Sequence, residues 1–187
     1  MRGLRDEGAR GGQSITRREV SIPPRPESVG VSRIRREVSA VTQSPPSPLP
    51  FAVQDRVRWS DCDPLGIIYY GTYIRFFEVA EHEMFRAAGL PYELMRVQRH
   101  VQLPRKAFQV EFHSPAEMDE LLTIEVGVSR IGTTALTMRF EAYRASDRRH
   151  RASATLTVVC VTKEGIEKRP LPDFVKDALS PYRVAAP

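Results

Sequence analysis

Residues 61–71 read DCDPLGIIYYG and place two carboxylates directly before an apolar segment and a glycine. Asp61 and Asp63 are the acids, and a helical pattern begins near Tyr70. The first N–H groups of a helix lack partners within the helix, and the helix dipole favours negative charge at that end. A carboxylate beside such donors has the parts for acyl transfer. The acid would attack or activate water, and the N–H groups would stabilise an oxyanion.

The same residues also have a purely structural interpretation. Asp-x-Asp-Pro favours turns, and an acid near a helix start often acts only as a cap. Cys62 is a second possible nucleophile, but no histidine is positioned beside it, so a small buried residue fits it better. Glu78, Glu81 and Glu83 on the following helix predict a solvated face, unless one of them points into a cleft.

Other kinds of chemical site find little support in the sequence. No histidine and carboxylate cluster has metal-ligand spacing, and there is no glycine-rich phosphate loop and no G-x-S-x-G motif. We therefore predict neither a metal nor a cofactor. The four histidines are expected to be structural or solvent-facing, with His82 and His113 in patterned elements and His100 and His150 in loops.

The elements that must position residues 61–71 are a strand before them and a long helix after them. Alternation predicts the strand over 51–60. Apolar residues at steps of three and four predict a helix of about five turns, with Thr72 as a candidate N-cap and Gly89 and Pro91 as the stop. Its expected apolar stripe is Tyr73, Phe77, Ala80, Met84 and Ala88.

The rest of the chain is predicted to be mostly strand. Alternating or apolar runs rich in β-branched residues are each bounded by a turn signal, and short connections favour antiparallel neighbours. The order is strand, helix and then further strands, which indicates an α+β fold in which one sheet wraps a single amphipathic helix. The further strands are expected at 106–114, 121–129, 134–145 and 151–162, with a short terminal helix at 171–179.

Composition separates a tail from a domain. The chain has 187 residues, is 41% hydrophobic and carries a net charge of +5. Residues 1–50 hold nine Arg, no Lys, five acids and no aromatic residue, so most of the surplus charge lies there. Such a segment cannot bury enough apolar surface to offset its ordering entropy, and we expect a disordered tail over 1–50 and a folded domain over 51–187. Because the domain is nearly neutral, we expect no nucleic-acid partner.

The tail and the cysteines bear on where the protein works. An Arg- and Ser-rich leader resembles a transit peptide in composition, although a solvated tail or an over-extended translation start explains it more simply. Two cysteines, Cys62 and Cys160, make neither a disulfide framework nor a zinc site. No apolar run approaches the roughly 20 residues that span a bilayer. A cytoplasmic setting without membrane attachment is the expectation.

The segment VRWSDCDPLGIIYYGTYIRFFEVAEHEMFRAAGL resembles the opening of the hotdog-fold acyl-CoA thioesterases, and most of all the 4-hydroxybenzoyl-CoA thioesterase and YbgC-like family. VEFHSPAEMDELLTIEVGVSRIGTTALTMRFEAYR is similar to that family's second to fourth strands. The resemblance covers about residues 51–165. It implies a hotdog fold, in which a curved antiparallel sheet wraps one long central helix, and a homodimer or homotetramer with active sites at the subunit interface.

The resemblance also implies roles for single residues. Asp63 would be the catalytic acid, the backbone N–H of Tyr70 the oxyanion donor, and Asp61 a supporting residue. Gly66 would let the backbone pass close to the thioester. The substrate is expected to be acyl-CoA or acyl carrier protein, contacted by residues of the motif and by Arg130. These expected substrate-binding residues are Gly66, Ile67, Ile68, Tyr69 and Arg130.

Two departures from the family pattern affect these expectations. Thr72 stands where the family often has Asn. The turn SRIGTT holds only Arg130, where members that act on aromatic acyl-CoA can carry several basic residues for the CoA phosphates. One alternative is a non-catalytic hotdog that binds acyl thioesters or serves in assembly, although a pure binder needs no acid at Asp63. A hydratase or dehydratase would need a histidine near the motif, and the candidates are His82 and His100.

Overall fold

The computed structural model describes residues 48–162 and 167–185. The expectations for residues 1–47 therefore lie outside the described residues. Residues 48–50, at the end of the expected tail, contact the domain. Leu49 is buried, and its backbone N–H donates to Glu125 Oε2 over 3.1 Å. No helix in these ranges combines the length and the apolar character needed to cross a membrane.

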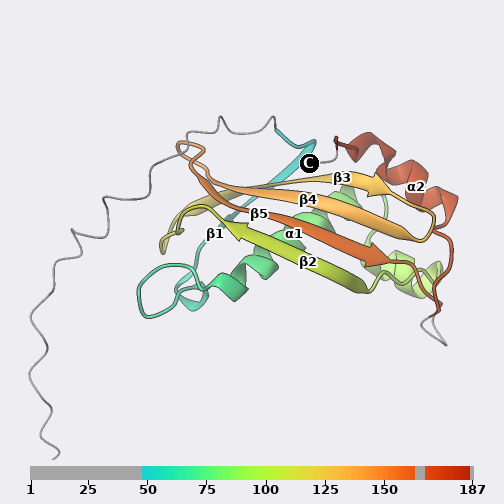
Figure 1. The fold of residues 1–187 in the computed structure, drawn as a ribbon, viewed down its shortest axis with the longest axis horizontal. Coiled ribbons are helices and arrows are strands. Elements are labelled where there is room, and N and C mark those ends of the chain that lie inside the picture. Colours follow the sequence, from blue (N-terminus) through green and yellow to red (C-terminus); the bar gives the residue numbers. More distant parts are fainter. Residues whose placement is uncertain (1–47, 163–166, 186–187) are drawn as a thin grey trace, which may run out of the picture. The chain divides into compact units, whose positions relative to one another are not determined.

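One antiparallel sheet of five strands forms the body of the domain (Figure 1). The strand order is β1-β3-β4-β5-β2, so β1 and β2 are the two edges although they are the first strands in the chain. The predicted strands are confirmed, with the first one shorter than expected. Their bounds are β1 Phe51–Arg56, β2 Arg105–Phe112, β3 Leu121–Ile131, β4 Ala135–Arg144 and β5 His150–Val159.

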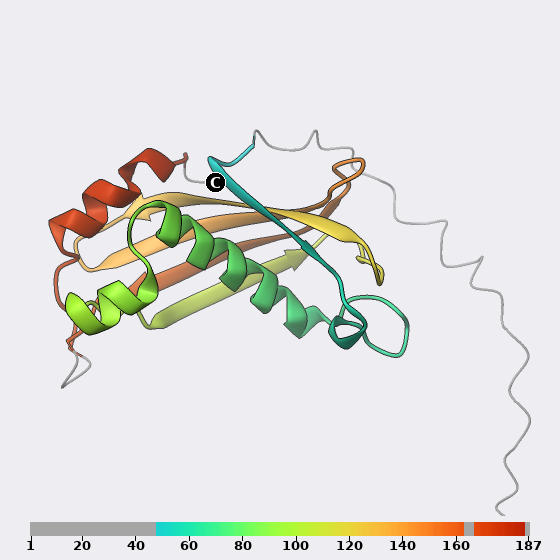
Figure 2. The ribbon, with the colours of Figure 1, turned by 180° about the vertical axis from the view of Figure 1, so that it is seen from behind.

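The long helix α1, Tyr73–Ala87, lies along one face of the curved sheet (Figure 2). It joins β1 at one edge to β2 at the other edge, so the chain must cross the whole face between these two strands. The short β3–β4 and β4–β5 connections join antiparallel neighbours, as expected. The expectation is wrong for the connection between β2 and β3, because β2 pairs with β5 at the edge of the sheet and residues 113–120 carry the chain past β5 and β4 to β3. This is the predicted hotdog arrangement of a sheet wrapped around a central helix.

The core lies between α1 and the inner face of the sheet. Four residues of the predicted apolar stripe are buried on α1, and Phe76 and Phe85 widen it. The fifth, Ala88, is the half-buried residue that follows the helix. Alternate residues of the central strands face the helix, since the side chains of a strand alternate between its two faces. These inward and fully or nearly fully buried residues include Leu122, Ile124, Val126, Val128, Met138, Phe140, Ala142 and Val158.

The start of α1 differs in detail from the prediction. A 3-10 turn, Tyr70–Thr72, precedes the α-helix, so Thr72 already has helical angles (φ −70°, ψ −23°) and its hydroxyl makes no capping hydrogen bond. The extended residue that starts the helical path is Tyr69. Gly89 ends the helix with φ +74°, as predicted. A π-helical turn, Leu94–Gln98, was not foreseen.

The C-terminal segment lies beside β3 just beyond the start of β1, whose first residue, Phe51, pairs with Val126. After α2, Asp173–Leu179, Arg183 forms a parallel bridge to Val128, and the Val184 N–H donates to the Val128 carbonyl over 3.0 Å. A Cβ on Gly127 would lie 2.8 Å from Val184 Cγ1 and 3.0 Å from Pro50 Cδ. Both ends of the described domain therefore pass close over β3 at Gly127, and a larger residue there would force one of them to shift.

Candidate active site

Residues 61–69 form a small hairpin between β1 and the helix. Tyr69 N–H donates to the Asp61 carbonyl and Asp63 N–H to the Ile67 carbonyl, each over 2.9 Å, and Cys62 bridges Ile68 between them. The returning arm is held in place by the loop before β3, because the Ile68 N–H donates to the Ala116 carbonyl. The two acids and the helix entry are thus parts of one hydrogen-bonded unit.

Asp63 starts the turn of this hairpin. Its carbonyl accepts from the Gly66 N–H over 3.0 Å, and its side-chain Oδ1 accepts from the Leu65 N–H over 2.8 Å. Proline at the second position and glycine at the fourth suit such a turn. Gly66 has φ +75°, a conformation that strains other residues. The carboxylate is half-buried, and Oδ2 makes no hydrogen bond within the described part of the chain.

Asp61 has the opposite environment. Only 5% of it is exposed, and its Oδ2 accepts from the Arg58 N–H and from the Arg75 guanidinium, each over 2.8 Å. Arg75, in the first turn of α1, also reaches Asp55 Oδ2 over 2.7 Å. Burial would raise the pKa of Asp55, but the hydrogen bonds from Arg75 and Arg56 outweigh it and lower that pKa. We call Asp55, Asp61 and Arg75 the entry clamp.

The helix entry offers two unused donors. The Thr72 N–H donates to the Tyr69 carbonyl and thereby closes the first turn, whereas the N–H groups of Tyr70 and Gly71 donate to no group among residues 48–162 and 167–185. Such groups at a helix start carry the positive end of the helix dipole. They follow directly after the hairpin arm that pairs with Asp61 and Asp63. A carboxylate and paired N–H donors are therefore joined by one short piece of backbone.

Large apolar side chains around the motif are exposed in the single chain. Trp59 and Leu65 are 81% and 80% exposed, and the rings of Tyr69 and Tyr70 pack on each other with centroids 4.4 Å apart. The cluster extends along the first turns of α1 and reaches the end of the edge strand β2. We call it the apolar rim, and its members are Trp59, Leu65, Tyr69, Tyr70, Ile74 and Phe112.

Tyr73 connects the apolar rim to the core. Its ring centroid lies 5.4 Å from that of Phe112 and 6.1 Å from that of Phe77. Its hydroxyl is buried without a hydrogen-bond partner in the described residues. Burial, supported by the Glu120 carboxylate, raises the pKa of Tyr73 to about 12, so the phenol stays neutral and does not serve as a base.

Cys62 lies between the two acids but is not a ready nucleophile. Its thiol faces the Arg58 carbonyl over 3.5 Å. Desolvation and then the charges of Asp61, Asp63 and Asp119 raise its pKa. Because the thiolate is the reactive form, these surroundings disfavour reaction at sulfur.

Glu81 departs most from the expected solvated face. It is fully buried in the middle of α1, where it accepts hydrogen bonds from the Tyr92 hydroxyl and, over 2.8 Å, from Arg105. Burial raises its pKa, and the bonds from Tyr92 and Arg105 only partly offset that effect. We call Glu81, Tyr92 and Arg105 the mid-helix cluster. Glu78 is exposed, as predicted, and Glu83 pairs with Arg86 near the surface.

The histidines lie away from the motif in the chain. His82 is twelve residues beyond Tyr70, about 18 Å along the helix, and its ring lies tilted against that of Tyr92 with centroids 4.5 Å apart. His100 is exposed with φ +51°. His150 is the first residue of β5 rather than a loop residue, and it stacks on His113 with ring centroids 4.0 Å apart.

The two stacked histidines belong to a polar network that spans β4, β5 and the residue after the end of β2. His150 Nε2 lies 2.7 Å from Glu141 Oε2, and His113 Nε2 lies 2.8 Å from Ser153 Oγ. Burial and the neighbouring His150 lower the pKa of His113. Neither histidine approaches Asp63 through a contact in the described residues, and no group of three His, Cys, Asp or Glu side chains there could hold a metal ion.

Arg130 is not brought to the motif within one chain. It is exposed near the end of β3, whereas the start of that strand, Leu121, pairs with Arg56 just before the motif. Nine residues of strand separate the two positions, roughly 30 Å. Ile67 is half-buried, Ile68 is buried, and Tyr69 is exposed, so the other predicted contact residues do lie at the hairpin.

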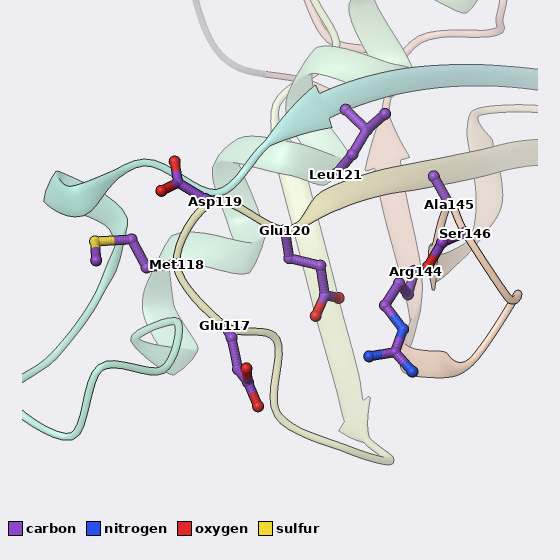
Figure 3. A pocket seen from close by; sticks show the side chains of 8 residues that line it. All are labelled: Glu117, Met118, Asp119, Glu120, Leu121, Arg144, Ala145 and Ser146. Atoms are coloured by element: carbon purple, nitrogen blue, oxygen red, sulfur yellow. The ribbon is translucent and has the colours of Figure 1, made fainter.

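A surface cavity of about 590 Å³ lies between the loop before β3 and the turn after β4. The side chains of Glu117, Glu120 and Arg144 extend toward it (Figure 3). Glu120 is bound to Arg151, and Arg144 to Asp147. Because acids outnumber bases in this lining, the cavity does not suit a phosphate group, and Asp63 is not among its lining residues.

Known proteins are similar to this chain in sequence and in fold. The chain is 29% identical over 120 residues to the acyl-CoA thioester hydrolase YbgC of Escherichia coli, which covers 64% of this chain and 88% of that protein. It is 29% identical over 96 residues to a 4-hydroxybenzoyl-CoA thioesterase of Pseudomonas sp., which covers 50% of this chain and 68% of that protein.

Solved structures and a family model extend the comparison to the domain. A thioesterase superfamily structure from Jannaschia sp. aligns with a TM-score of 0.67 and 26% identity, over 75% of this chain and 96% of that chain. The model of the Thioesterase-like superfamily matches residues 57–179, a range that holds the hairpin, α1 and four of the five strands. This chain therefore belongs to the Thioesterase-like superfamily.

Proposed function

We propose that the protein hydrolyses acyl thioesters at the hairpin and the helix entry. Asp63 attacks the thioester carbonyl or activates water, and the N–H groups of Tyr70 and Gly71 stabilise the oxyanion. The thiol of CoA, or of acyl carrier protein, leaves. The names of the curated relatives support the reaction class.

The observation that carries this proposal is the contrast between the two acids. Asp61 is buried and ion-paired with Arg75. Asp63 is only half-buried, has no ion pair among the described residues, and its side chain accepts a single hydrogen bond there, from the Leu65 N–H. A nucleophile or base needs a free lone pair, and an oxyanion site needs donors that no other group uses. Asp63 and the start of the helix meet both needs within one hydrogen-bonded unit.

We further propose that two copies share each active site. β2 is an edge strand of eight residues whose side chains are mostly exposed, and it ends at Phe112 in the apolar rim. Exposed edges and apolar patches favour pairing with another chain. Two β2 strands that pair would extend the sheet and place the partner subunit beside Tyr70 and Asp63. A dimer, or a tetramer built from dimers, follows.

The same pairing would give Arg130 a role. Within one chain it is far from the motif, so it can bind a CoA phosphate only if the ligand or the partner subunit spans that distance. We place the reaction in a reducing, cytoplasmic setting, because Cys62 and Cys160 are both free thiols. No cofactor is needed for this chemistry.

The alternative is a hotdog that binds acyl thioesters, or assembles with other proteins, without catalysis. It would use the apolar rim and the free N–H groups but would not need the charge of Asp63. A hydratase or dehydratase is less well supported, because His82 and His100 are removed from the motif.

A panel of acyl-CoA and acyl carrier protein thioesters, read by thiol release, tests the proposal. We expect turnover by the wild type and a loss of about 100-fold or more in Asp63→Asn, with an unchanged melting temperature. Asparagine keeps an oxygen for the Leu65 N–H but removes the charge. Asp61→Asn should be milder. Binding of the thioesters without turnover would favour the non-catalytic alternative, and full activity of Asp63→Asn would reject the role of Asp63.

A further inference from the structure

We propose that Arg75 is a positioning residue for this active site. Its guanidinium bridges Asp55 and Asp61 and thereby fixes the hairpin against the first turn of α1, which sets Asp63 relative to the N–H groups of Tyr70 and Gly71. The inference rests on the proposed function and adds to it a residue that does not touch the substrate.

The geometry of the bridge is the first argument. One arm of the guanidinium lies 2.7 Å from Asp55 Oδ2 and the other 2.8 Å from Asp61 Oδ2. Asp55 belongs to β1, Asp61 to the hairpin and Arg75 to α1, so one side chain ties three elements together. A planar fork with donors in fixed directions can do this, whereas the single ammonium of lysine cannot hold both carboxylates in the same way.

Asp61 passes this constraint to both arms of the hairpin. Its carboxylate holds the Arg58 N–H on the incoming side, and its carbonyl holds the Tyr69 N–H on the returning side. Asp63 lies two residues after Asp61, and Tyr70 directly follows Tyr69. A shift of Asp61 would therefore move the carboxylate and the N–H donors together with it.

Burial makes the bridge more than a surface ion pair. Asp61 is 5% exposed, and the Arg75 guanidinium lies 4.0 Å from the centroid of the Phe76 ring. Removal of Arg75 would leave a buried carboxylate without its charge partner, which is strongly unfavourable. The hairpin would move to hydrate Asp61, and displacements of about 1 Å can cost about 100-fold in rate.

Three variants test the role in the full-length protein. Arg75→Met should lower kcat about 30- to 100-fold and leave KM within about threefold, because the geometry of the reacting groups changes and substrate contacts do not. Arg75→Lys should restore only part of kcat, because it returns the charge without the fork. Arg86→Met is the matched control on the same helix. Its partner is Glu83, both side chains are largely exposed, and kcat should stay at the wild-type value.

A double variant separates positioning from stability. Asp61→Asn combined with Arg75→Met removes the unpaired buried charge, so the melting temperature should return toward that of the wild type. If Arg75 positions the site, kcat stays low in the double variant. If kcat recovers together with the melting temperature, the role of Arg75 is stability alone and the inference is overturned.

A measurement independent of turnover completes the test. In ¹⁵N spectra of the folded protein, the amide resonances of Tyr70 and Gly71 should shift or broaden in Arg75→Met and stay unchanged in Arg86→Met. Unchanged amides together with wild-type kcat in Arg75→Met would overturn the inference. Asp63→Asn, measured alongside, keeps the two proposals distinct. If that variant is fully active the proposed function fails, and the amide resonances still decide the role of Arg75.

Discussion

The entry clamp and the mid-helix cluster lie about two turns apart on α1 and use the same chemical groups. In the entry clamp, the buried Asp61 of the hairpin pairs with Arg75 of α1. In the mid-helix cluster, the buried Glu81 of α1 pairs with Arg105 of β2. They differ in what they leave unused. Glu81 gives one oxygen to Tyr92 and the other to Arg105, and that cluster closes on itself. The entry clamp holds a hairpin whose Asp63 and first helical N–H groups keep free hydrogen-bonding capacity.

The contrast between Glu81 and the proposed site shows that a perturbed pKa alone does not distinguish a functional carboxyl group from a structural one. Burial raises the pKa of Glu81, yet both of its carboxylate oxygens accept hydrogen bonds from side chains of the same chain. The informative signal at the helix entry is the set of groups that the fold positions and then does not use. Perturbed acids are candidates for function, but ion-pair networks perturb them as well.

The largest expected effect comes from removal of one unused donor. Tyr70→Pro deletes the N–H of the first helical residue, where proline is tolerated, and Tyr69 already has the extended angles φ −65° and ψ 132° that a residue before proline requires. We expect kcat to fall about 100- to 1000-fold. Tyr70→Ala, which keeps the N–H, is the control, and equal kcat in the two variants would exclude this donor.

The mid-helix cluster should respond in stability instead. Glu81→Ala leaves the Tyr92 hydroxyl without its acceptor and opens a cavity, so the free energy of unfolding should fall by about 2–4 kcal/mol in urea titrations. Per folded molecule, kcat should stay within about threefold of the wild type. A loss of kcat as large as that of Asp63→Asn would remove the distinction between the two regions.

The pH dependence of stability should have opposite signs in the two regions. The pKa of Asp55 is lowered from 3.8 in the folded state, so its contribution is present above that value and is lost as the pH falls through the lower folded pKa. The pKa of Glu81 is raised from 4.5, so its contribution is present at low pH and is lost as the pH rises above 4.5 through the folded pKa. Unfolding of Asp55→Asn and Glu81→Gln, each compared with the wild type from pH 2.5 to 7, measures both slopes. Slopes of the same sign would contradict this assignment.

The smallest effect is expected from the exposed pair on the same helix. Glu83 Oε1 lies 2.6 Å from the Arg86 guanidinium, but the two side chains are 45% and 58% exposed. Glu83→Gln should change the free energy of unfolding by less than about 0.5 kcal/mol and leave kcat unchanged. A larger change would mean that burial is not what separates the two clusters from an ordinary surface pair.

Periodicity predicted most of the fold. The alternation in the strands and the stripe at Phe77, Ala80 and Met84 located every strand and α1, because burial on one face imposes those periods. The same stripe contained a signal for Glu81, which lies four residues after Phe77 and four before Phe85 and so falls on the buried face. Because Glu81 is charged, it is expected to be solvated, although its spacing places it on the buried face.

Local sequence patterns could not predict which charged residues pair with each other. Arg75 is twenty residues after Asp55, and Arg105 is twenty-four after Glu81, so only the packed fold brings these groups together. The motif was recognisable from its own sequence, whereas the exposure of Trp59 and Leu65 depends on what surrounds them. The π-helical turn at Leu94–Gln98 has no period in the sequence that distinguishes it from an ordinary helix end.

Cys62 has a practical consequence for this site. Its pKa is raised because carboxylates surround a desolvated thiol, so little thiolate is available to oxidants or to alkylating reagents. The centre of the motif should tolerate peroxide at concentrations that modify low-pKa cysteines. Disulfide dyes that report a released thiol should leave the hairpin intact during an assay, and covalent inhibitors of this site should target a carboxylate rather than sulfur.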